Sequence, residues 1–359
     1  MPEEMALLAL SVTDDCNLRC RYCYACGGEK KTAMRWEVAE RAIDVMAECF
    51  PRFKIQFTGG EPLLEIDLIE EAVDYLDQIG LRSPCQVQSN ATLIDPDVAG
   101  KLSCLRIGVG VSLDGPPPVN DALRPFPDGR GSAASALCGI AALRDEGIRV
   151  GATCVLSREN AFALAGLVDL LSYMGNVEGI AIDVLRPVGR AAQPMQPDPY
   201  AAAKCIDEAV SRADRLAEMG GPRVKFRELE RMLHTVKCSR ARRHHCYFDS
   251  CRSLVVLADG RSYVCPSLLG PEMIMGRIDD PSFKDGLPDR MAHARRLVPG
   301  RQECESCPDR WLCGGPCLAH QAIGSDPSVE CAVKKAFIRH ARRDLEIDHA
   351  DLQEMSGDN

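Results

Sequence analysis

The sequence predicts an α/β fold: a partial, TIM-like (β/α)6 barrel followed by a small cysteine-rich domain. Three observations support this. The first half alternates short apolar runs with amphipathic runs in about six strand–helix units, which is typical of a parallel sheet covered by helices. Six units are fewer than the eight that close a barrel, so the barrel is expected to stay open. From Cys238 onward, short strands and loops carrying nine cysteines replace this alternation.

Each element follows from its pattern of apolar residues and turn residues. Residues 36–49 place Val38, Ala42, Val45 and Met46 at helical spacing, and Gly80 closes the helix of residues 68–80. Asp259-Gly260 marks the turn of a hairpin over residues 253–264. The expected strands of the core are 6–12, 53–60, 85–93, 106–115, 149–157 and 179–189; the expected helices are 36–49, 68–80, 95–103, 131–147, 160–175, 200–219 and 225–236.

Changes of composition along the chain predict four parts. Residues 1–195 form the barrel core, and residues 196–236 form a helical bridge that begins in a stretch rich in proline and alanine. Residues 237–345 form the cysteine-rich domain, and residues 346–359 form an acidic, frayed tail.

Composition excludes several classes of function. The net charge of −9 argues against bulk nucleic-acid binding. No run of ~18 apolar residues is present to span a membrane, and the acidic N-terminus is not a secretory signal. An odd count of 19 cysteines in a long chain without an export signal does not suit a disulfide framework. We therefore expect a cytoplasmic protein whose clustered cysteines serve metal or redox chemistry.

The first cluster, Cys16-x3-Cys20-x2-Cys23, lies on a loop directly after the first strand. Three thiolates can bind three irons of a [4Fe–4S] cluster and leave one iron open to a chelating ligand. The alternative is a structural zinc site, for which only Cys26 is near enough in sequence to provide a fourth ligand.

The run CNLRCRYCY resembles the signature of the radical S-adenosylmethionine (SAM) enzymes. The resemblance implies that SAM chelates the open iron and is cleaved by one electron to a 5′-deoxyadenosyl radical, which abstracts hydrogen from a substrate. It also implies SAM contacts at successive strand ends, with Arg124 placed to pair the SAM carboxylate and Leu185 to pack against adenine. The residues implied are Tyr22, Gly59, Gly60, Glu61, Asn90, Ser112, Asp114, Arg124 and Leu185. Gln88 is expected to face the same end of the barrel.

The C-terminal cysteines resemble the SPASM extension of radical SAM proteins, which binds two further [4Fe–4S] clusters and so implies three in all. Thirteen residues separate Cys246 from Gly260, and four separate Gly260 from Cys265. The resemblance implies an inner cluster (auxiliary I) on Cys246, Cys265 and Cys317, with Cys251 as our choice of fourth ligand, and an outer cluster (auxiliary II) on Cys304, Cys307, Cys313 and Cys331. A pair of zinc sites is the alternative, and Cys26 and Cys238 stay unassigned.

Relatives with this architecture mostly modify peptides or proteins, so we expect a peptide maturase that forms a thioether, a carbon–carbon crosslink or a related oxidation. Sulfatase maturases carry an aspartate that acts as a base, directly after the cysteine that corresponds to Cys265. This chain has Pro266 at that position, so formylglycine formation ranks second. No catalytic base is assigned, although Asp249 and Asp280 are conceivable substitutes. A small-molecule or cofactor-precursor enzyme and a plain iron–sulfur electron carrier stay as alternatives.

The partners that this reading implies are the substrate and a reductant. The reductant would be a ferredoxin or flavodoxin, and the basic run from Lys237 to His245 is a candidate surface for it. The chain begins only about fifteen residues before its first cluster. We therefore expect that any leader peptide of the substrate is bound by a separate protein.

Overall fold

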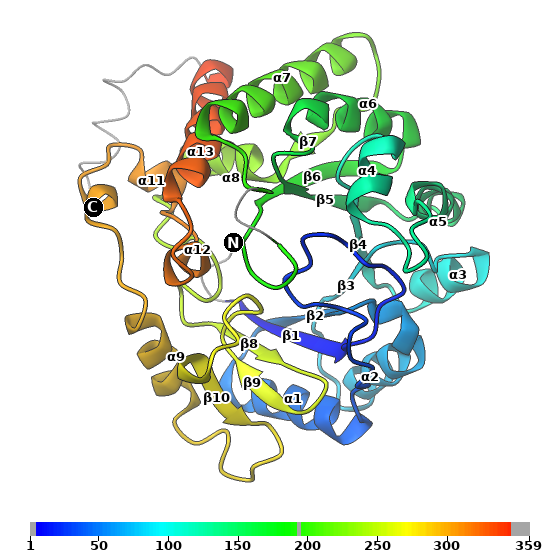
Figure 1. The fold of residues 1–359 in the computed structure, drawn as a ribbon. Helices are drawn as coiled ribbons and strands as arrows, with labels where there is room; N and C mark the ends of the chain where they lie inside the picture. Colours follow the sequence, from blue (N-terminus) through cyan, green and yellow to red (C-terminus); the bar gives the residue numbers. More distant parts are fainter. Residues whose placement is uncertain (1–4, 192–194, 346–359) are drawn as a thin grey trace.

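The computed structural model describes residues 5–191 and 195–345. Within these residues one sheet runs in the order β10-β9-β8-β1-β2-β3-β4-β5-β6-β7 (Figure 1). Its strands are β1 (Ala6–Thr13), β2 (Phe53–Gly59), β3 (Cys85–Ser89), β4 (Gly108–Ser112), β5 (Val150–Leu156), β6 (Val177–Val184), β7 (Lys225–Phe226), β8 (Ser253–Val256), β9 (Arg261–Tyr263) and β10 (Ile274–Arg277).

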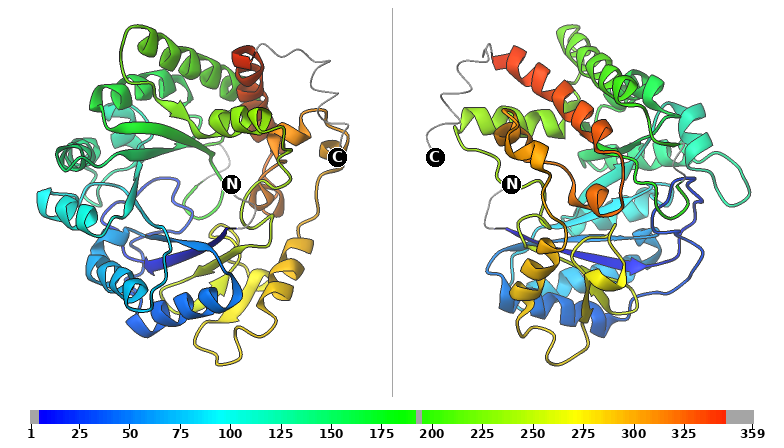
Figure 2. Two further views of the ribbon diagram at one scale, coloured as in Figure 1. Left: turned by 180° about the vertical axis from the view of Figure 1, so that it is seen from behind. Right: turned by 60° about the vertical axis from the view of Figure 1, so that its left-hand side comes forward.

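Helices cover the outer side of the sheet, as the views from behind and from the side also show (Figure 2). They are α1 (Trp36–Cys49), α2 (Ile66–Gln78), α3 (Pro96–Cys104), α4 (Pro117–Leu123), α5 (Ala133–Asp145), α6 (Leu164–Met174), α7 (Pro199–Glu218), α8 (Arg227–Lys237), α9 (Leu287–Arg296), α10 (Gln302–Glu305), α11 (Arg310–Cys313), α12 (Leu318–Ala322) and α13 (Pro327–Leu345), with short 3-10 turns η1 (Pro62–Glu65), η2 (Ala161–Ala163) and η4 (Pro271–Met273). Among the described residues, no helix combines the length and the apolar character that crossing a membrane requires.

Strands β1 to β6 are neighbours in sequence order and pair in parallel, which confirms the predicted partial barrel. Strand β2 shows why the sheet curves around a polar interior. Its residues Phe53, Ile55 and Phe57 are buried in the apolar core with the helices, while Lys54 and Gln56 between them are only half-buried. Because successive side chains of a strand point to opposite faces, the polar set lies on the concave face of the sheet.

The C-terminal half extends this sheet. Strands β8 and β9 form the predicted antiparallel hairpin, but β8 also runs parallel to β1, with Leu8 opposite Leu254. Helix α13, which the sequence pattern did not single out, packs against α7 and α8 on the open side of the arc (Figure 1). The division at residues 195 and 236 stays a prediction, and the expected tail of residues 346–359 lies outside the described residues.

The ends of β1 and β2 approach each other through their backbones. The Gly60 N–H donates to Thr13 O at 2.8 Å, and the Glu61 N–H donates to Asp15 O at 2.9 Å. A Cβ atom on Gly60 would lie 2.0 Å from Asp15 O, so only glycine permits this approach. Gly59 has a φ of +138°, which side chains rarely tolerate.

The Glu61 carboxylate joins the end of β2 to the end of β3. It is 1% exposed and accepts hydrogen bonds from Ser89 Oγ at 2.7 Å, the Asn90 N–H at 2.8 Å and the Leu63 N–H at 3.2 Å. Burial raises the pKa of Glu61 to about 7, because the charged form loses its water, although these hydrogen bonds oppose the rise.

We expect Gly60→Ala to lower the free energy of unfolding by ~2–4 kcal/mol, since the added methyl group would collide with backbone. Gly100→Ala is the matched control, because a Cβ there meets nothing within 4 Å and alanine is favoured inside helix α3. Urea unfolding measures both. A Gly60→Ala protein as stable as Gly100→Ala would contradict this account of the strand ends.

Glu61 also predicts a pH dependence of stability. Its pKa in the folded protein, about 7, lies above the ordinary 4.5, so its contribution is complete below pH 4.5 and is lost as pH rises through 7. Glu61→Gln should be less stable overall, but it should lack this loss, which amounts to up to ~3 kcal/mol. Unfolding at pH 5.5 and pH 8 is the test, with Glu37→Gln on the exposed face of α1 as the control. If the free energy of unfolding changed equally with pH in the parent protein, Glu61→Gln and Glu37→Gln, the raised pKa of Glu61 would be refuted.

Candidate functional site

Cys16, Cys20 and Cys23 lie together on the loop that connects β1 to α1. The pKa of the Cys16 thiol is raised to about 12, mainly by burial and to a smaller extent by the nearby groups of Glu61, Cys20 and Cys23. The Leu18 N–H donates to Cys16 Sγ at 3.4 Å. The raised pKa keeps this thiol neutral unless a bound cation takes it as a thiolate.

Two arginines hold the backbone of this loop. Arg19 donates from Nη1 to Cys16 O at 2.7 Å and from Nη2 to Gly28 O at 2.9 Å. Arg190, in the segment after β6, donates from Nε to Cys20 O at 3.1 Å. The sequence analysis assigned neither arginine a role, because their partners are backbone carbonyls that no motif records. The loop is therefore fixed in place although it has no regular secondary structure.

Tyr22, Asp114 and Arg124, which the SAM motif assigned separately, form one buried group. Arg124 donates to Asp114 from Nε at 2.7 Å and from Nη2 at 3.1 Å, and the Tyr22 hydroxyl donates to Asp114 Oδ2. The Arg124 guanidinium lies 5.4 Å from the centroid of the Tyr22 ring. Two nitrogens of the Arg124 guanidinium thus bind Asp114, although the resemblance implies that Arg124 pairs with the SAM carboxylate. The partner that the structure shows for Arg124 is therefore a residue of the chain itself.

The remaining predicted SAM contacts lie at successive strand ends. Gln88 donates from Nε2 to Ser112 Oγ at 3.1 Å. Asn90 donates from Nδ2 to Oδ1 of Asn17, a residue of the cysteine loop that the sequence analysis missed, at 2.8 Å. Leu185 is 1% exposed and packs in a small apolar cluster with Tyr22. The structure thus brings the residues of the motif to one edge of the sheet.

In the C-terminal region, the structure brings Cys246, Cys265 and Cys317 together. Burial raises the pKa of Cys265 to about 12, and the thiols of Cys317 and Cys246 add to the rise. Burial also raises the pKa of Cys251, but the charged groups that act on it are Arg295, Asp249 and Arg296. The structure does not place Cys251 among the three, so its role as fourth ligand stays a prediction.

The four cysteines predicted for the outer cluster also lie near one another. Burial raises the pKa of Cys304, Arg301 opposes this, and the thiols of Cys313, Cys307 and Cys331 raise the pKa further. These residues come from α10, α11, the turn between them and α13, so a long stretch of chain is required to assemble them.

The three cysteine sets offer thiols as their only donors. Within the described residues, no three Cys, His, Asp or Glu side chains converge closely enough to hold one metal ion. Sets of three and four cysteines suit [4Fe–4S] clusters by their donor chemistry, and four thiols also suit structural zinc.

The segment after β6 contacts both cysteine regions. The Arg190 N–H donates to Cys23 O at 3.0 Å. Arg186, four residues earlier, donates to both carboxylate oxygens of Asp183, at 3.0 and 2.8 Å. Burial would lower the pKa of Arg186, but Asp183 and the thiols of Cys317 and Cys265 raise it. The first cysteine loop and the inner cysteine set therefore face a common region, lined by an ion pair that the sequence analysis did not identify.

The two conceivable bases both have partners in this structure. Asp249 is buried, accepts from the His245 N–H at 2.8 Å and pairs with Arg295 at 2.7 Å. Asp280 accepts from Ser282 on an exposed turn. A role as base stays a prediction for each of them.

The basic run of residues 237–245 is only partly a surface feature. Arg242 forms an ion pair with the buried Glu228 at 3.0 Å, and His245 accepts a hydrogen bond from Lys334 at 2.8 Å. Two basic residues of the candidate surface for the reductant, Arg242 and His245, therefore bind groups in the interior. Arg243 stays exposed and, with Arg310 and Trp311, borders a recess beside Cys307.

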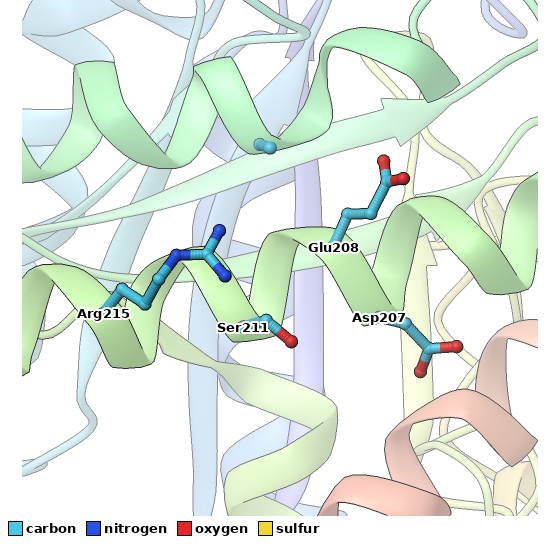
Figure 3. A pocket seen from close by; sticks show the side chains of 5 residues that line it. Asp207, Glu208, Ser211 and Arg215 are labelled. Carbon is cyan, nitrogen blue, oxygen red and sulfur yellow. The ribbon is translucent and has the colours of Figure 1, made fainter.

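A recess between α6 and α7 is lined by Ala165, Asp207, Glu208, Ser211 and Arg215 (Figure 3). Of its polar side chains, Glu208 and Asp207 point in different directions. Asp207 pairs with Arg339 and His340 of α13. These side chains converge on no common point, so the recess is not a candidate active site.

Comparison with known proteins agrees with this geometry. Residues 10–171 match the radical SAM superfamily. The chain is 35% identical to an uncharacterised protein of Methanocaldococcus jannaschii over 78% of this chain and 91% of that protein. It is 31% identical to Fe-coproporphyrin III synthase of Methanosarcina barkeri over 61% of this chain and 54% of that protein. It is 23% identical to the cysteine-type anaerobic sulfatase-maturating enzyme of Clostridium perfringens over 94% and 96% of the two chains.

The fold is also similar to a solved structure of native anSMEcpe with bound AdoMet and Cp18Cys peptide. The TM-score is 0.78 at 20% identity, with 95% of this chain and 98% of that chain covered. The family match includes the loop of Cys16, Cys20 and Cys23 and the strand ends that surround it. The chain therefore belongs to the radical SAM superfamily of enzymes, which use a [4Fe–4S] cluster and SAM.

Proposed function

We propose that this enzyme carries three [4Fe–4S] clusters and modifies a peptide or protein substrate by radical chemistry. The observation that carries the proposal is the gathering of three separate cysteine groups, two of which meet the same segment of residues 183–190. Cys16, Cys20 and Cys23 would hold the SAM cluster. Reductive cleavage of SAM there supplies a 5′-deoxyadenosyl radical that takes hydrogen from the substrate.

The chain's own residues would bind and orient SAM. The bare backbone of Gly59 and Gly60 leaves room for the methionine end of SAM beside the cysteine loop. Ser112 and Asn90, at neighbouring strand ends, offer hydroxyl and amide groups, and Leu185 offers an apolar surface for adenine. Asp114 holds Tyr22 and Arg124 in place, which leaves Nη1 of Arg124 to face an anion.

A peptide substrate is supported by similarity that spans the whole architecture. The sulfatase-maturating relative aligns along 94% of this chain, and the similar solved structure contains a bound peptide. The Cys246, Cys265 and Cys317 set and the Cys304, Cys307, Cys313 and Cys331 set would hold the auxiliary clusters of a SPASM-like domain. A ferredoxin or flavodoxin would supply electrons, and a separate protein would present any leader peptide.

Formylglycine formation is disfavoured by Pro266, since proline has no group that accepts a proton, and by the engagement of Asp249 with Arg295. The second candidate is oxidation of a cofactor precursor. It is favoured by the 31% identity to Fe-coproporphyrin III synthase, although the chain covers only 54% of that protein. A plain electron carrier needs neither an open three-cysteine site nor the strand-end contacts around it.

Anaerobically prepared protein should contain about twelve irons and should release 5′-deoxyadenosine from SAM after reduction. Cys20→Ala should abolish this release while the C-terminal clusters stay loaded. Cys313→Ala should lose about four irons and all turnover with substrate, yet still cleave SAM. Iron analysis and chromatography measure these outcomes.

Cys104→Ala is the matched control, because this exposed cysteine belongs to none of the three sets. It should retain all iron and full SAM cleavage. A wild-type protein that holds only zinc and leaves SAM intact would overturn the proposal.

The substrate class can be tested directly. Incubation with SAM, a reductant and a candidate precursor peptide should yield a peptide that has lost hydrogen, detected by mass spectrometry. Fe-coproporphyrin III is the competing substrate in a parallel reaction. Conversion of the porphyrin with no change in any peptide would replace the first candidate by the second.

A further inference from the structure

Helix α13 carries two charged residues on its buried face. Glu330 and Lys334 are 6% and 5% exposed and lie one turn apart, among apolar neighbours such as Val333 and Phe337. Burying a charge is costly unless the charge is paired and hydrogen-bonded. An ion pair at this position therefore needs close partners that satisfy both charges.

The two charges form one compact ion pair with complete partners. Lys334 Nζ lies 3.0 Å from Glu330 Oε1, donates to His245 Nδ1 at 2.8 Å and donates to Gly315 O. The Glu330 oxygens accept the Cys317 N–H at 2.9 and 3.0 Å. The nearby Glu228 forms ion pairs of its own with Arg242 and with Arg231, each at 3.0 Å.

The partners of the ion pair flank cysteines of both C-terminal sets. His245 directly precedes Cys246 and Glu330 directly precedes Cys331, whereas Gly315 lies midway between Cys313 and Cys317. The inner set and the outer set therefore meet at this one ammonium and this one carboxylate. The Glu228–Arg242 pair lies beside this ion pair, since Arg242 donates from Nη2 to His245 O at 3.0 Å and from its backbone N–H to Trp311 O at 2.8 Å.

Charge position decides what such a pair does to a neighbouring cluster. A [4Fe–4S] cluster gains one negative charge when it is reduced, so a nearby cation stabilises the reduced form and a nearby anion destabilises it. These effects are stronger in the interior than at the surface, because little water is present to screen them.

We propose that Lys334 and Glu330 tune the reduction potentials of the two auxiliary clusters, the ammonium raising them and the carboxylate lowering them. This inference rests on the proposed assignment of the seven cysteines to two clusters. The two residues act through the loops that they contact, so they are positioning and tuning residues and not catalytic ones.

The test is a redox titration of the full chain followed by electron paramagnetic resonance. A Cys16→Ala, Cys20→Ala, Cys23→Ala background removes the signal of the SAM cluster, so that only the auxiliary clusters are observed. Lys334→Met should shift the midpoint potentials down, and Glu330→Gln should shift them up, since its amide oxygen can still accept the Cys317 N–H. Opposite shifts are the signature of electrostatic tuning, because a structural tie would not produce them.

Two further variants are the controls. Lys334→Arg keeps the charge and should keep the potentials of the parent. Lys284→Met removes a positive charge from a partly exposed lysine that pairs with Glu48, and it should cause no shift.

Unchanged potentials, or shifts of the same sign in Lys334→Met and Glu330→Gln, would overturn the inference. Loss of the clusters from Glu330→Gln would also count against it, since the pair would then be a structural tie. If Lys334→Met fails to fold, the upward shift of Glu330→Gln decides alone. A parent protein without auxiliary clusters would instead refute the proposed function, so the two failures are distinguishable.

Discussion

The direct backbone contact between the ends of β1 and β2 is the constraint on which the site depends. The hydrogen bonds of Gly60 and Glu61 to Thr13 and Asp15 set the point at which the cysteine loop leaves the sheet. Gly27 extends this contact, because a Cβ there would lie 3.2 Å from both Cys16 Cβ and Gly60 Cα. Three stretches of chain thus meet without intervening side chains, and the thiols are held on a loop that has no helix or strand of its own. A side chain at Gly27 or Gly60 would collide with the cysteine loop itself and would displace the thiols.

The C-terminal region is connected by different means. Its cysteines lie on loops and helices that buried ion pairs join to distant parts of the chain. Lys334 from α13 reaches His245 and Gly315, Glu330 accepts the Cys317 N–H, and Glu228 from α8 reaches Arg242. Such pairs contribute little net stability, because desolvation offsets most of the attraction.

The comparisons and the site together separate what the chain shares with its relatives from what is its own. The chain is similar to relatives whose names state unlike activities, Fe-coproporphyrin III synthase and a sulfatase-maturating enzyme, so the shared fold does not by itself set the substrate. This chain carries Pro266 after Cys265 and an Asp183–Arg186 ion pair near the inner cysteines.

The sequence by itself determined the alternating strands and helices of the first half and the partial barrel, because these depend on local periodicity. The cysteine sets followed from a resemblance to a known family, and their assignment to clusters stays a prediction. It also marked Gly59 and Gly60, since a motif records a backbone that must stay bare. Only the tertiary structure decided that β8 extends the sheet beside β1 and that Arg124 binds Asp114. It alone placed Arg190 on the cysteine loop and Lys334 between two cysteine sets. These contacts join residues far apart in the chain, and a lone arginine or lysine has the same local pattern whether it faces solvent or a buried carbonyl.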